Sequence, residues 1–143
     1  MKRKAWAAAL LLATVAVLCL VLLRPWEKPG GVRVFLDGQE VAEGSAVSSF
    51  ASSDTDDLRV VLTLDGQEIA NLPFGEAHTI RVLQANGDEN TLVLTGESVR
   101  MESANCEGQD CVHMEEITRD NLETRVMFGM IICLPHRLSV EVR

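Results

Sequence analysis

The sequence predicts an all-β fold, a small barrel or sandwich of short strands, preceded by one N-terminal transmembrane helix. Two observations predict the β-domain. Short runs of apolar and β-branched residues recur along residues 32–143, separated by glycine, asparagine or proline, and no long amphipathic helical pattern interrupts them. A third observation predicts the helix: residues 5–23 form an apolar run without a single charge.

The N-terminal segment has the features of a signal-anchor. As a helix, residues 5–23 would span about 28 Å, close to the hydrocarbon thickness of a bilayer. Three basic residues at positions 2–4 precede the run, and Trp6 and Trp26 lie near its ends. Basic flanks stay cytoplasmic and tryptophans favour the membrane interface. We therefore expect residues 1–23 to be a cytoplasmic stub and an anchor in a bacterial cell membrane, with the C-terminal domain extracytoplasmic.

A cleaved signal peptide and a lipoprotein are the alternatives to an anchor. A cleaved peptide usually has a shorter apolar core, and no small-x-small site follows this one. A lipoprotein would use Cys19, but Leu18 stands where a small residue is normally required. We expect the anchor to be retained and to contact the lipid bilayer through residues 5–23.

The exposed part of the chain is acidic. Residues 24–31, "RPWEKPGG", read as a linker, and residues 32–143 as the domain. Three of the 13 lysines and arginines precede the apolar run, so ten face all 21 acidic residues beyond it, a net charge of −11. Such a surface repels nucleic acid, and the domain has no tyrosine or tryptophan on which bases would stack. We expect no nucleic-acid partner.

Two similar hairpins are predicted within this domain. "VRVFLDGQEVA" at 32–42 and "VVLTLDGQEIA" at 60–70 are identical at seven of eleven positions. Each contains Asp-Gly, which suits a tight hairpin because both residues accept positive φ. Convergence on good turn chemistry explains the likeness, and a duplicated hairpin is the alternative. The Ser-rich and acidic stretch 43–57 between them reads as a loop.

The rest of the domain is predicted to be mostly strands. Residues 78–84, 90–96 and 98–104 are short and β-rich. Residues 130–143 read as two strands interrupted at Pro135, because proline cannot donate to a ladder. Residues 115–127 are expected to form one surface helix.

The C-terminal half, "SVRMESANCEGQDCVH" followed by "IICLPHRLSVEV", resembles the NusG domain II family. The family pattern is a strand ending in Ala-Asn-Cys, four residues, Cys-Val, a spacer, and Cys-Leu-Pro before a closing strand. The matching residues are Ala104, Asn105, Cys106, Cys111, Val112, Cys133, Leu134 and Pro135. The match is best over residues 60–143. The resemblance implies a stand-alone, membrane-anchored extracytoplasmic β-domain and brings no reaction with it.

Three cysteines lie in the exposed domain, where an extracytoplasmic compartment permits disulfides. We expect a structural role for Cys106, Cys111 and Cys133, with one disulfide and one thiol left over. A bridge from Cys106 or Cys111 to Cys133 would close some 20 residues and stabilise the fold by about 3 kcal/mol. A bridge between Cys106 and Cys111 would instead clip one loop. The sequence leaves the pairing open.

Metal and enzyme interpretations are the alternatives. Cys111-Val-His113 and Cys133-Leu-Pro-His136 follow the order of Rieske ligands, in which two cysteines and two histidines hold a [2Fe–2S] cluster. Zinc would find enough cysteines and histidines, although Cys-x4-Cys is looser than the usual knuckle. A nucleophilic Cys111 assisted by His113 would need an oxyanion hole that no motif marks. We therefore expect no cofactor and no catalytic residue.

The sequence thus predicts an accessory protein held at the outer face of the membrane, which binds another membrane or extracytoplasmic protein. The NusG domain II resemblance adds that the partner belongs to an extracytoplasmic redox or transport complex. An electron-transfer protein using Cys111, His113, Cys133 and His136 is the alternative class, and a thiol-dependent enzyme comes third.

Overall fold

The computed structural model describes residues 31–41 and 58–143. The chain divides into two compact units, Met1–Gly30 and Gly31–Arg143, and every described residue belongs to the second. The predicted anchor, most of the predicted linker and the predicted loop 43–57 lie outside the described residues. Within them, no helix has the length and apolar character needed to cross a membrane.

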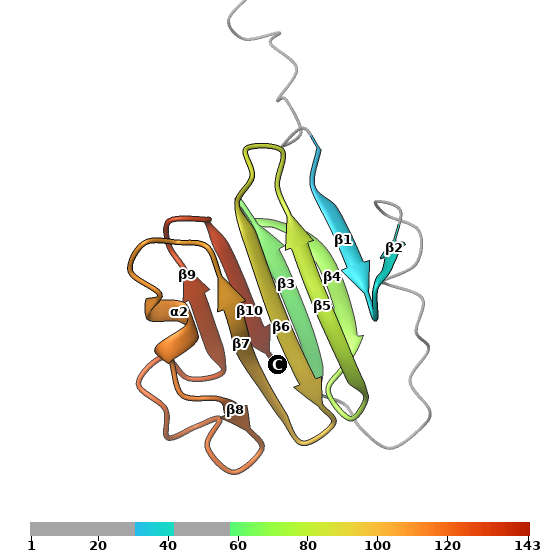
Figure 1. The fold of residues 1–143 in the computed structure, drawn as a ribbon. Helices are drawn as coiled ribbons and strands as arrows, with labels where there is room; N and C mark the ends of the chain where they lie inside the picture. Colours follow the sequence, from blue (N-terminus) through green and yellow to red (C-terminus); the bar gives the residue numbers. More distant parts are fainter. Residues whose placement is uncertain (1–30, 42–57) are drawn as a thin grey trace, which may run out of the picture. The chain divides into compact units, whose positions relative to one another are not determined.

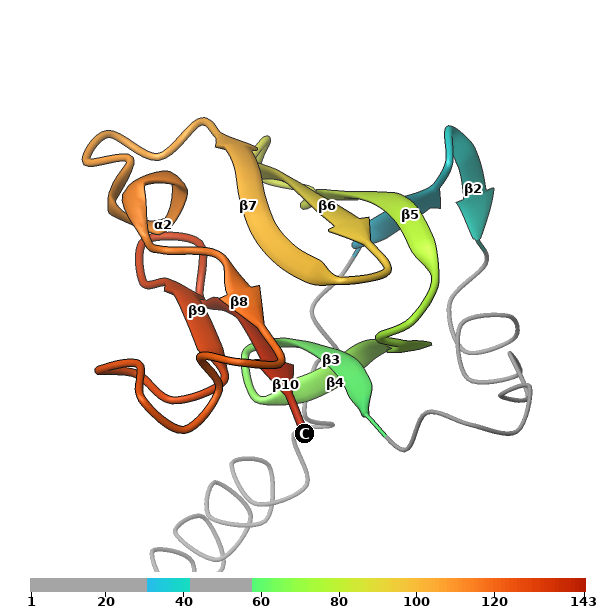
Figure 2. The ribbon, with the colours of Figure 1, turned by 90° about the horizontal axis from the view of Figure 1, so that it is seen from below.

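Two antiparallel sheets face each other as a sandwich (Figures 1 and 2). The larger sheet has the order β2 (Gln39–Val41), β1 (Arg33–Leu36), β5 (Ala77–Leu83), β6 (Glu89–Thr95), β7 (Ser98–Ala104) and β8 (Ile117–Thr118). The smaller sheet has the order β4 (Gln67–Pro73), β3 (Arg59–Leu64), β10 (Leu138–Val142) and β9 (Met130–Cys133). The all-β prediction is confirmed. Of the two predicted architectures the structure is the sandwich, and the sheets do not close into a barrel.

Alternating side chains on the strands form the core between the sheets. In β10, Leu138, Val140 and Val142 are buried, whereas Ser139 and Glu141 are partly exposed. This period of two is what a strand with one inward face requires. The largest fully buried side chains come from both sheets and include Leu62, Leu64, Leu72, Phe74, Ile80, Leu92, Leu94, Met101 and Leu138.

Both predicted Asp-Gly hairpins are confirmed. Asp37 and Gly38 have φ of 49° and 83°, and Asp65 and Gly66 have φ of 51° and 78°. Positive φ at both central residues is the requirement of a type I′ turn. The two hairpins enter different sheets, because β1 pairs with β5 in the larger sheet and β3 pairs with β10 in the smaller one.

The later strands confirm the predictions to within a residue, and the closing segment divides around Pro135 as expected. The surface helix predicted at 115–127 is wrong. Ile117 and Thr118 pair with β7 as β8, and turns follow. The Asn121 side chain accepts a hydrogen bond from the Thr118 N–H (2.8 Å) and donates one to the Glu116 carbonyl (2.9 Å). Such local side-chain bonds offer the backbone an alternative to the helix.

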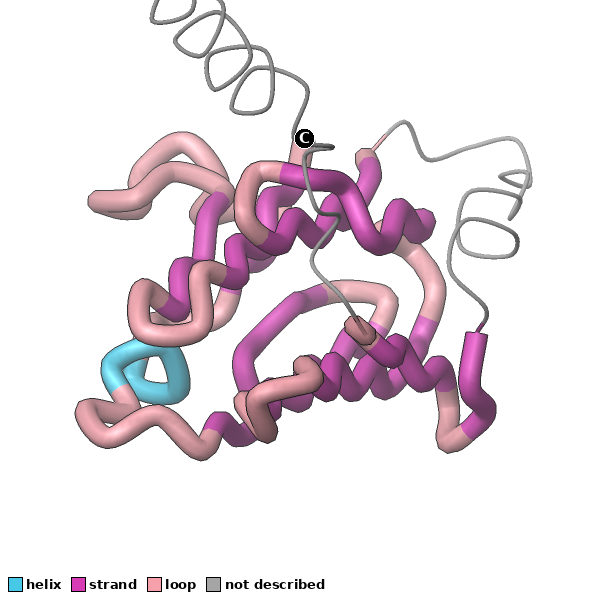
Figure 3. Tube along the Cα trace, turned by 90° about the horizontal axis from the view of Figure 1, so that it is seen from above, coloured by secondary structure: helices cyan, strands magenta, loops and turns pink. Residues whose placement is uncertain are grey.

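One short helix, α2 (Asp110–His113), was not predicted. It lies at one end of the sandwich, beside β7 and β9 (Figure 3). Its four residues fall in the middle of the cysteine motif, so it decides where the motif's side chains go.

The first Asp-Gly turn is tied to β5 by a histidine between two carboxylates. Asp37 accepts a hydrogen bond from the Thr79 N–H (2.8 Å), and its other oxygen lies 2.8 Å from His78 Nδ1. His78 Nε2 lies 3.1 Å from a Glu76 oxygen. Burial alone would lower the pKa of His78, but the bonds and charges of Asp37 and Glu76 outweigh it and raise the pKa.

This contact predicts a pH dependence of stability. Because the folded-state pKa of His78 is raised, its contribution is complete below the unfolded pKa of about 6.5 and is lost as pH rises through the folded pKa. We expect His78→Gln to reduce the fall in unfolding free energy across that window. Urea denaturation of both chains between about pH 5.5 and 8.5 measures the difference. Parallel curves for the two chains would show that folding leaves the pKa of His78 unchanged.

Candidate functional site

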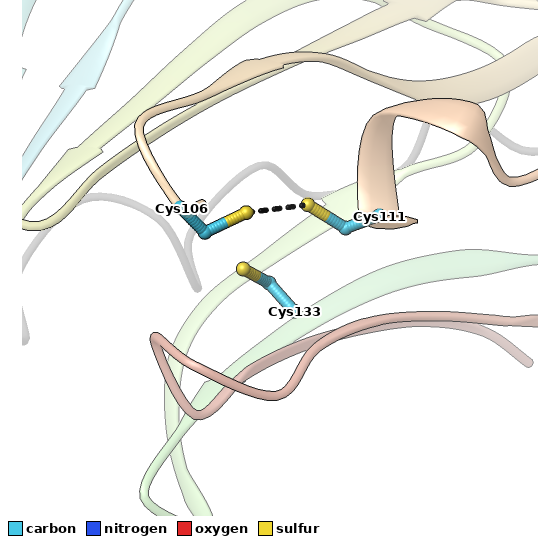
Figure 4. Close-up of side chains that lie close together, drawn as sticks. All are labelled: Cys106, Cys111 and Cys133. Atoms are coloured by element: carbon cyan, nitrogen blue, oxygen red, sulfur yellow. Dashed lines mark hydrogen bonds between the residues drawn. The ribbon is translucent and has the colours of Figure 1, made fainter. Parts of the chain in front are cut away.

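The three cysteines of the exposed domain converge at the end of the sandwich that carries α2. Cys106 lies in the loop after β7, Cys111 lies in α2, and Cys133 is the last residue of β9. All three are free thiols with 1–6% of their surface exposed. Their Sγ atoms all lie within 4.8 Å of one another, and those of Cys106 and Cys111 are 3.7 Å apart (Figure 4).

Two amide side chains fix the loop that carries Cys106. Asn105 accepts a hydrogen bond from the Glu89 N–H (2.8 Å) and donates one to the Gly87 carbonyl (2.9 Å), which ties the loop to the turn before β6. Gln109 has φ of 56° and donates to the carbonyls of Cys106 (3.0 Å) and Ala104. The loop therefore closes on itself and directs Cys106 inward. Sequence reasoning found Asn105 through the motif but missed Gln109, which no sequence signal marks.

A pocket of about 270 Å³ lies against the thiols. Its wall is largely apolar and includes Met114, Met127, Ile132, Leu134 and Pro135 besides the three cysteines. Leu134 and Pro135, both predicted as motif residues, are exposed at its rim, and Val112 is half-buried in α2. The motif thus supplies the thiols, the tether of the loop and part of the pocket rim.

The thiol of Cys111, which contacts both other thiols, keeps its proton well above neutral pH. Burial raises the pKa of Cys111 to about 12, helped by contacts with the thiols of Cys133 and Cys106. A nucleophilic cysteine needs the opposite shift, which a nearby cation or an activating base produces. The pocket therefore gives no support to the alternative of a thiol-dependent enzyme acting through Cys111.

The two histidines of the predicted Rieske set do not join the thiols. Among the described residues, the potential metal-ligand group contains only the three cysteines. His113 is exposed at the end of α2. His136 is buried, but its Nδ1 lies 2.7 Å from Asn90 Oδ1 and its Nε2 lies 3.7 Å from an oxygen of Asp88. Sequence proximity placed both histidines near cysteines, and the fold turns them elsewhere.

The arrangement is suited to two kinds of chemistry. A disulfide would require two of the sulfur atoms to move closer than they lie here, so the predicted disulfide stays a prediction and its pairing stays open. A disulfide would exclude a site that uses all three thiols. All three together can hold a thiophilic metal ion.

The sequence matches the model of one known protein family. The family model of NusG domain II matches residues 7–143. The chain belongs to the NusG domain II family. This agrees with the motif in which Asn105 tethers the cysteine loop, and it confirms the resemblance found in the sequence.

This NusG domain II protein is similar to several solved structures. A DUF1312 family protein from Ruminococcus gnavus is 30% identical over 60% of this chain and 97% of its own, with a TM-score of 0.47. A DUF1312 family protein from Enterococcus faecalis is 26% identical over 60% and 95%, with a TM-score of 0.52. The Lin0431 protein from Listeria innocua is 21% identical over 62% and 97%, with a TM-score of 0.51. No curated protein matches the chain.

Proposed function

We propose that this NusG domain II protein is a membrane-anchored, extracytoplasmic accessory protein that works by binding another protein. The observation that carries the proposal is the position of its exposed apolar side chains. Among the described residues, all the large apolar side chains that are exposed fall within residues 126–134. They are Val126 (94% exposed), Met127 (40%), Phe128 (69%) and Leu134 (78%). We call these four residues the apolar surface.

The apolar surface borders the cysteine pocket, since Met127 and Leu134 line it. Large apolar side chains scattered singly need no explanation, but a group rimmed by polar residues is typical of an interaction site. Phe128 has a φ of 50°, a conformation that a bulky residue rarely adopts, and its side chain is exposed. The strained residue and its exposed ring point to a role in binding.

A protein fits this surface better than a lipid headgroup layer does. Four exposed carboxylates lie in the same connection between α2 and β9, at Glu115, Glu116, Asp120 and Glu123. Together with the net charge of −11 beyond the apolar run, they repel anionic lipids. We therefore propose that the partner presents an apolar depression surrounded by basic residues. We further propose that it belongs to an extracytoplasmic redox or transport complex.

Site-specific photo-crosslinking in membranes of the native host tests this proposal. A photoreactive amino acid at position 128 should give one protein adduct of defined mass, whereas the same residue at Thr79, exposed on β5, should give none. Excess wild-type chain should compete for the adduct, and a chain with Val126→Asp and Phe128→Asp should compete at least about tenfold less well, because apolar contacts at an interface core carry most of its energy.

Protease accessibility and the chemical identity of the adduct provide two further tests of the proposal. Protease added to intact spheroplasts should digest the domain, and protection from it would place the domain inside the cell. Mass spectrometry of the adduct should identify a protein. Lipid adducts at position 128 would assign the apolar surface to the bilayer instead.

A further inference from the structure

The three buried thiols form a ligand set with only one kind of donor atom. They come from separate segments, namely the loop after β7, α2 and the end of β9, and the fold brings them together without a histidine or carboxylate from the described residues (Figure 4). A group of three thiols buried for core packing alone would not need to place all its sulfur atoms against one another. Their convergence is the feature that requires a chemical explanation.

The spacing of the sulfur atoms suits a single ion. A thiolate lies about 2.3 Å from a bound metal, so two thiolates of one ion lie at most about 4.6 Å apart. The Cys106 and Cys111 sulfur atoms, at 3.7 Å, are already within that range. All three lie within 4.8 Å of one another, so only a small contraction brings every pair within that range. The bonds of Asn105 and Gln109 hold the Cys106 loop in place for it.

We propose that Cys106, Cys111 and Cys133 bind one Cu(I) ion in a three-sulfur site. Structural zinc is almost always held by four tetrahedral ligands, and the described residues supply no fourth ligand to this group. Soft thiolate and thioether sulfur favours Cu(I), zinc and iron–sulfur clusters, and of these Cu(I) is the one that two or three such ligands satisfy. The thioethers of Met114 and Met127 line the adjoining pocket and add to its soft character.

The pocket gives the ion a route to the thiols. Its volume of about 270 Å³ is ample for a partly ligated copper ion, and its wall is apolar apart from the loop 108–110. Each cysteine that coordinates the ion releases its thiol proton to solvent, and the copper stays in the +1 state throughout. Met127 and Leu134 belong both to this pocket and to the apolar surface of the proposed function, but the three ligand cysteines do not belong to that surface. The two proposals are therefore tested through different residues, and either can fail without the other.

Titration of the reduced full-length chain with Cu(I) under anaerobic conditions tests the site, in a Cys19→Ser background that removes the cysteine outside the described residues. We expect one equivalent to be taken from a chromophoric Cu(I) chelator, with thiolate-to-copper absorption in the near ultraviolet. Loss of a residue that only hydrogen-bonds to a metal ligand already costs about 10–100-fold in metal affinity. Each of Cys106→Ser, Cys111→Ser and Cys133→Ser removes a ligand itself and should cost at least about 100-fold. His113→Ala, exposed and two residues from Cys111, is the matched control and should bind as the parent does.

A second measurement needs no variant at the site, in case a serine disturbs folding. One equivalent of Cu(I) should protect two or three of the parent's thiols from alkylation, as counted by intact mass. Three outcomes would overturn the proposal: unchanged alkylation, displacement of the bound copper by equimolar Zn(II), or a disulfide among these cysteines in chain trapped directly from native membranes.

Discussion

Replacement of Phe74 by alanine should lower the free energy of unfolding by about 3–5 kcal/mol. The residue follows β4, its N–H donates to the Leu58 carbonyl (3.0 Å), and its ring is fully buried. The Arg119 guanidinium lies 5.1 Å from the ring centre and covers it from one side. Deleting the ring leaves a cavity between two sheets whose backbones are fixed by their ladders, so the site collapses poorly.

The matched control is Phe35→Ala, the same change on the outer sheet surface. Phe35 is half-buried, with the Arg33 and Arg81 guanidinium groups 5.0 and 5.5 Å from its ring centre. We expect this change to cost about 1 kcal/mol. Far-ultraviolet circular dichroism in urea is the suitable measurement, since residues 31–143 contain no tryptophan. Similar losses for the two changes would show that Phe74 is not a core residue.

Gly129→Ala should cost about 2–3 kcal/mol through overpacking. A β-carbon at Gly129 would lie 2.5 Å from the Val142 carbonyl oxygen and 3.0 Å from Leu122 Cδ2. The first neighbour is backbone and cannot move aside, because the Val142 N–H also donates to the Gly129 carbonyl (2.8 Å). Relief of the clash would push the segment that carries Phe128 away from β10.

The control for this change is Gly108→Ala in the cysteine loop. There the new β-carbon would lie 3.3 Å from Asp110 Oδ2, the end of an exposed side chain that can move, and the backbone is not left-handed. We expect an effect within about 0.5 kcal/mol. Denaturation midpoints compare the two, and hydrogen exchange of the Val142 amide should accelerate in Gly129→Ala alone. Unchanged protection of that amide would contradict the predicted clash.

Local signals explain how much of the fold the sequence predicts. Asp37-Gly38 and Asp65-Gly66 specify their hairpins because the turn chemistry is contained in two residues. The turn chemistry does not specify which sheet a hairpin joins. The two similar hairpins enter different sheets because that choice depends on the pairing of β1 with β5 and of β3 with β10. The helix expected at 115–127 fails for a related reason: Asn121 bonds and the pairing of Ile117 with Val99 outweigh local helical preference.

The sequence also predicts one part of the cysteine site and fails to predict another. The motif marks Cys106, Cys111 and Cys133, and the structure brings all three together. The sequence also places His113 and His136 beside cysteines, but spacing along the chain cannot report direction in space. One turn of α2 leaves His113 exposed, and His136 lies in the turn between β9 and β10, bonded to Asn90.

The pairing of β3 with β10 has a consequence for how the chain acquires its fold. The hydroxyls of Thr63 and Ser139 meet at 2.5 Å across 76 positions of sequence. Long-range pairings of this kind must close a large loop first, which slows folding. During synthesis from the N-terminus, the β3–β4 hairpin exists with the apolar edge of β3 open until residues 138–142 arrive. An open edge strand is a template for association with other chains, so we expect a nascent chain that lacks residues 138–142 to aggregate more readily than the complete chain.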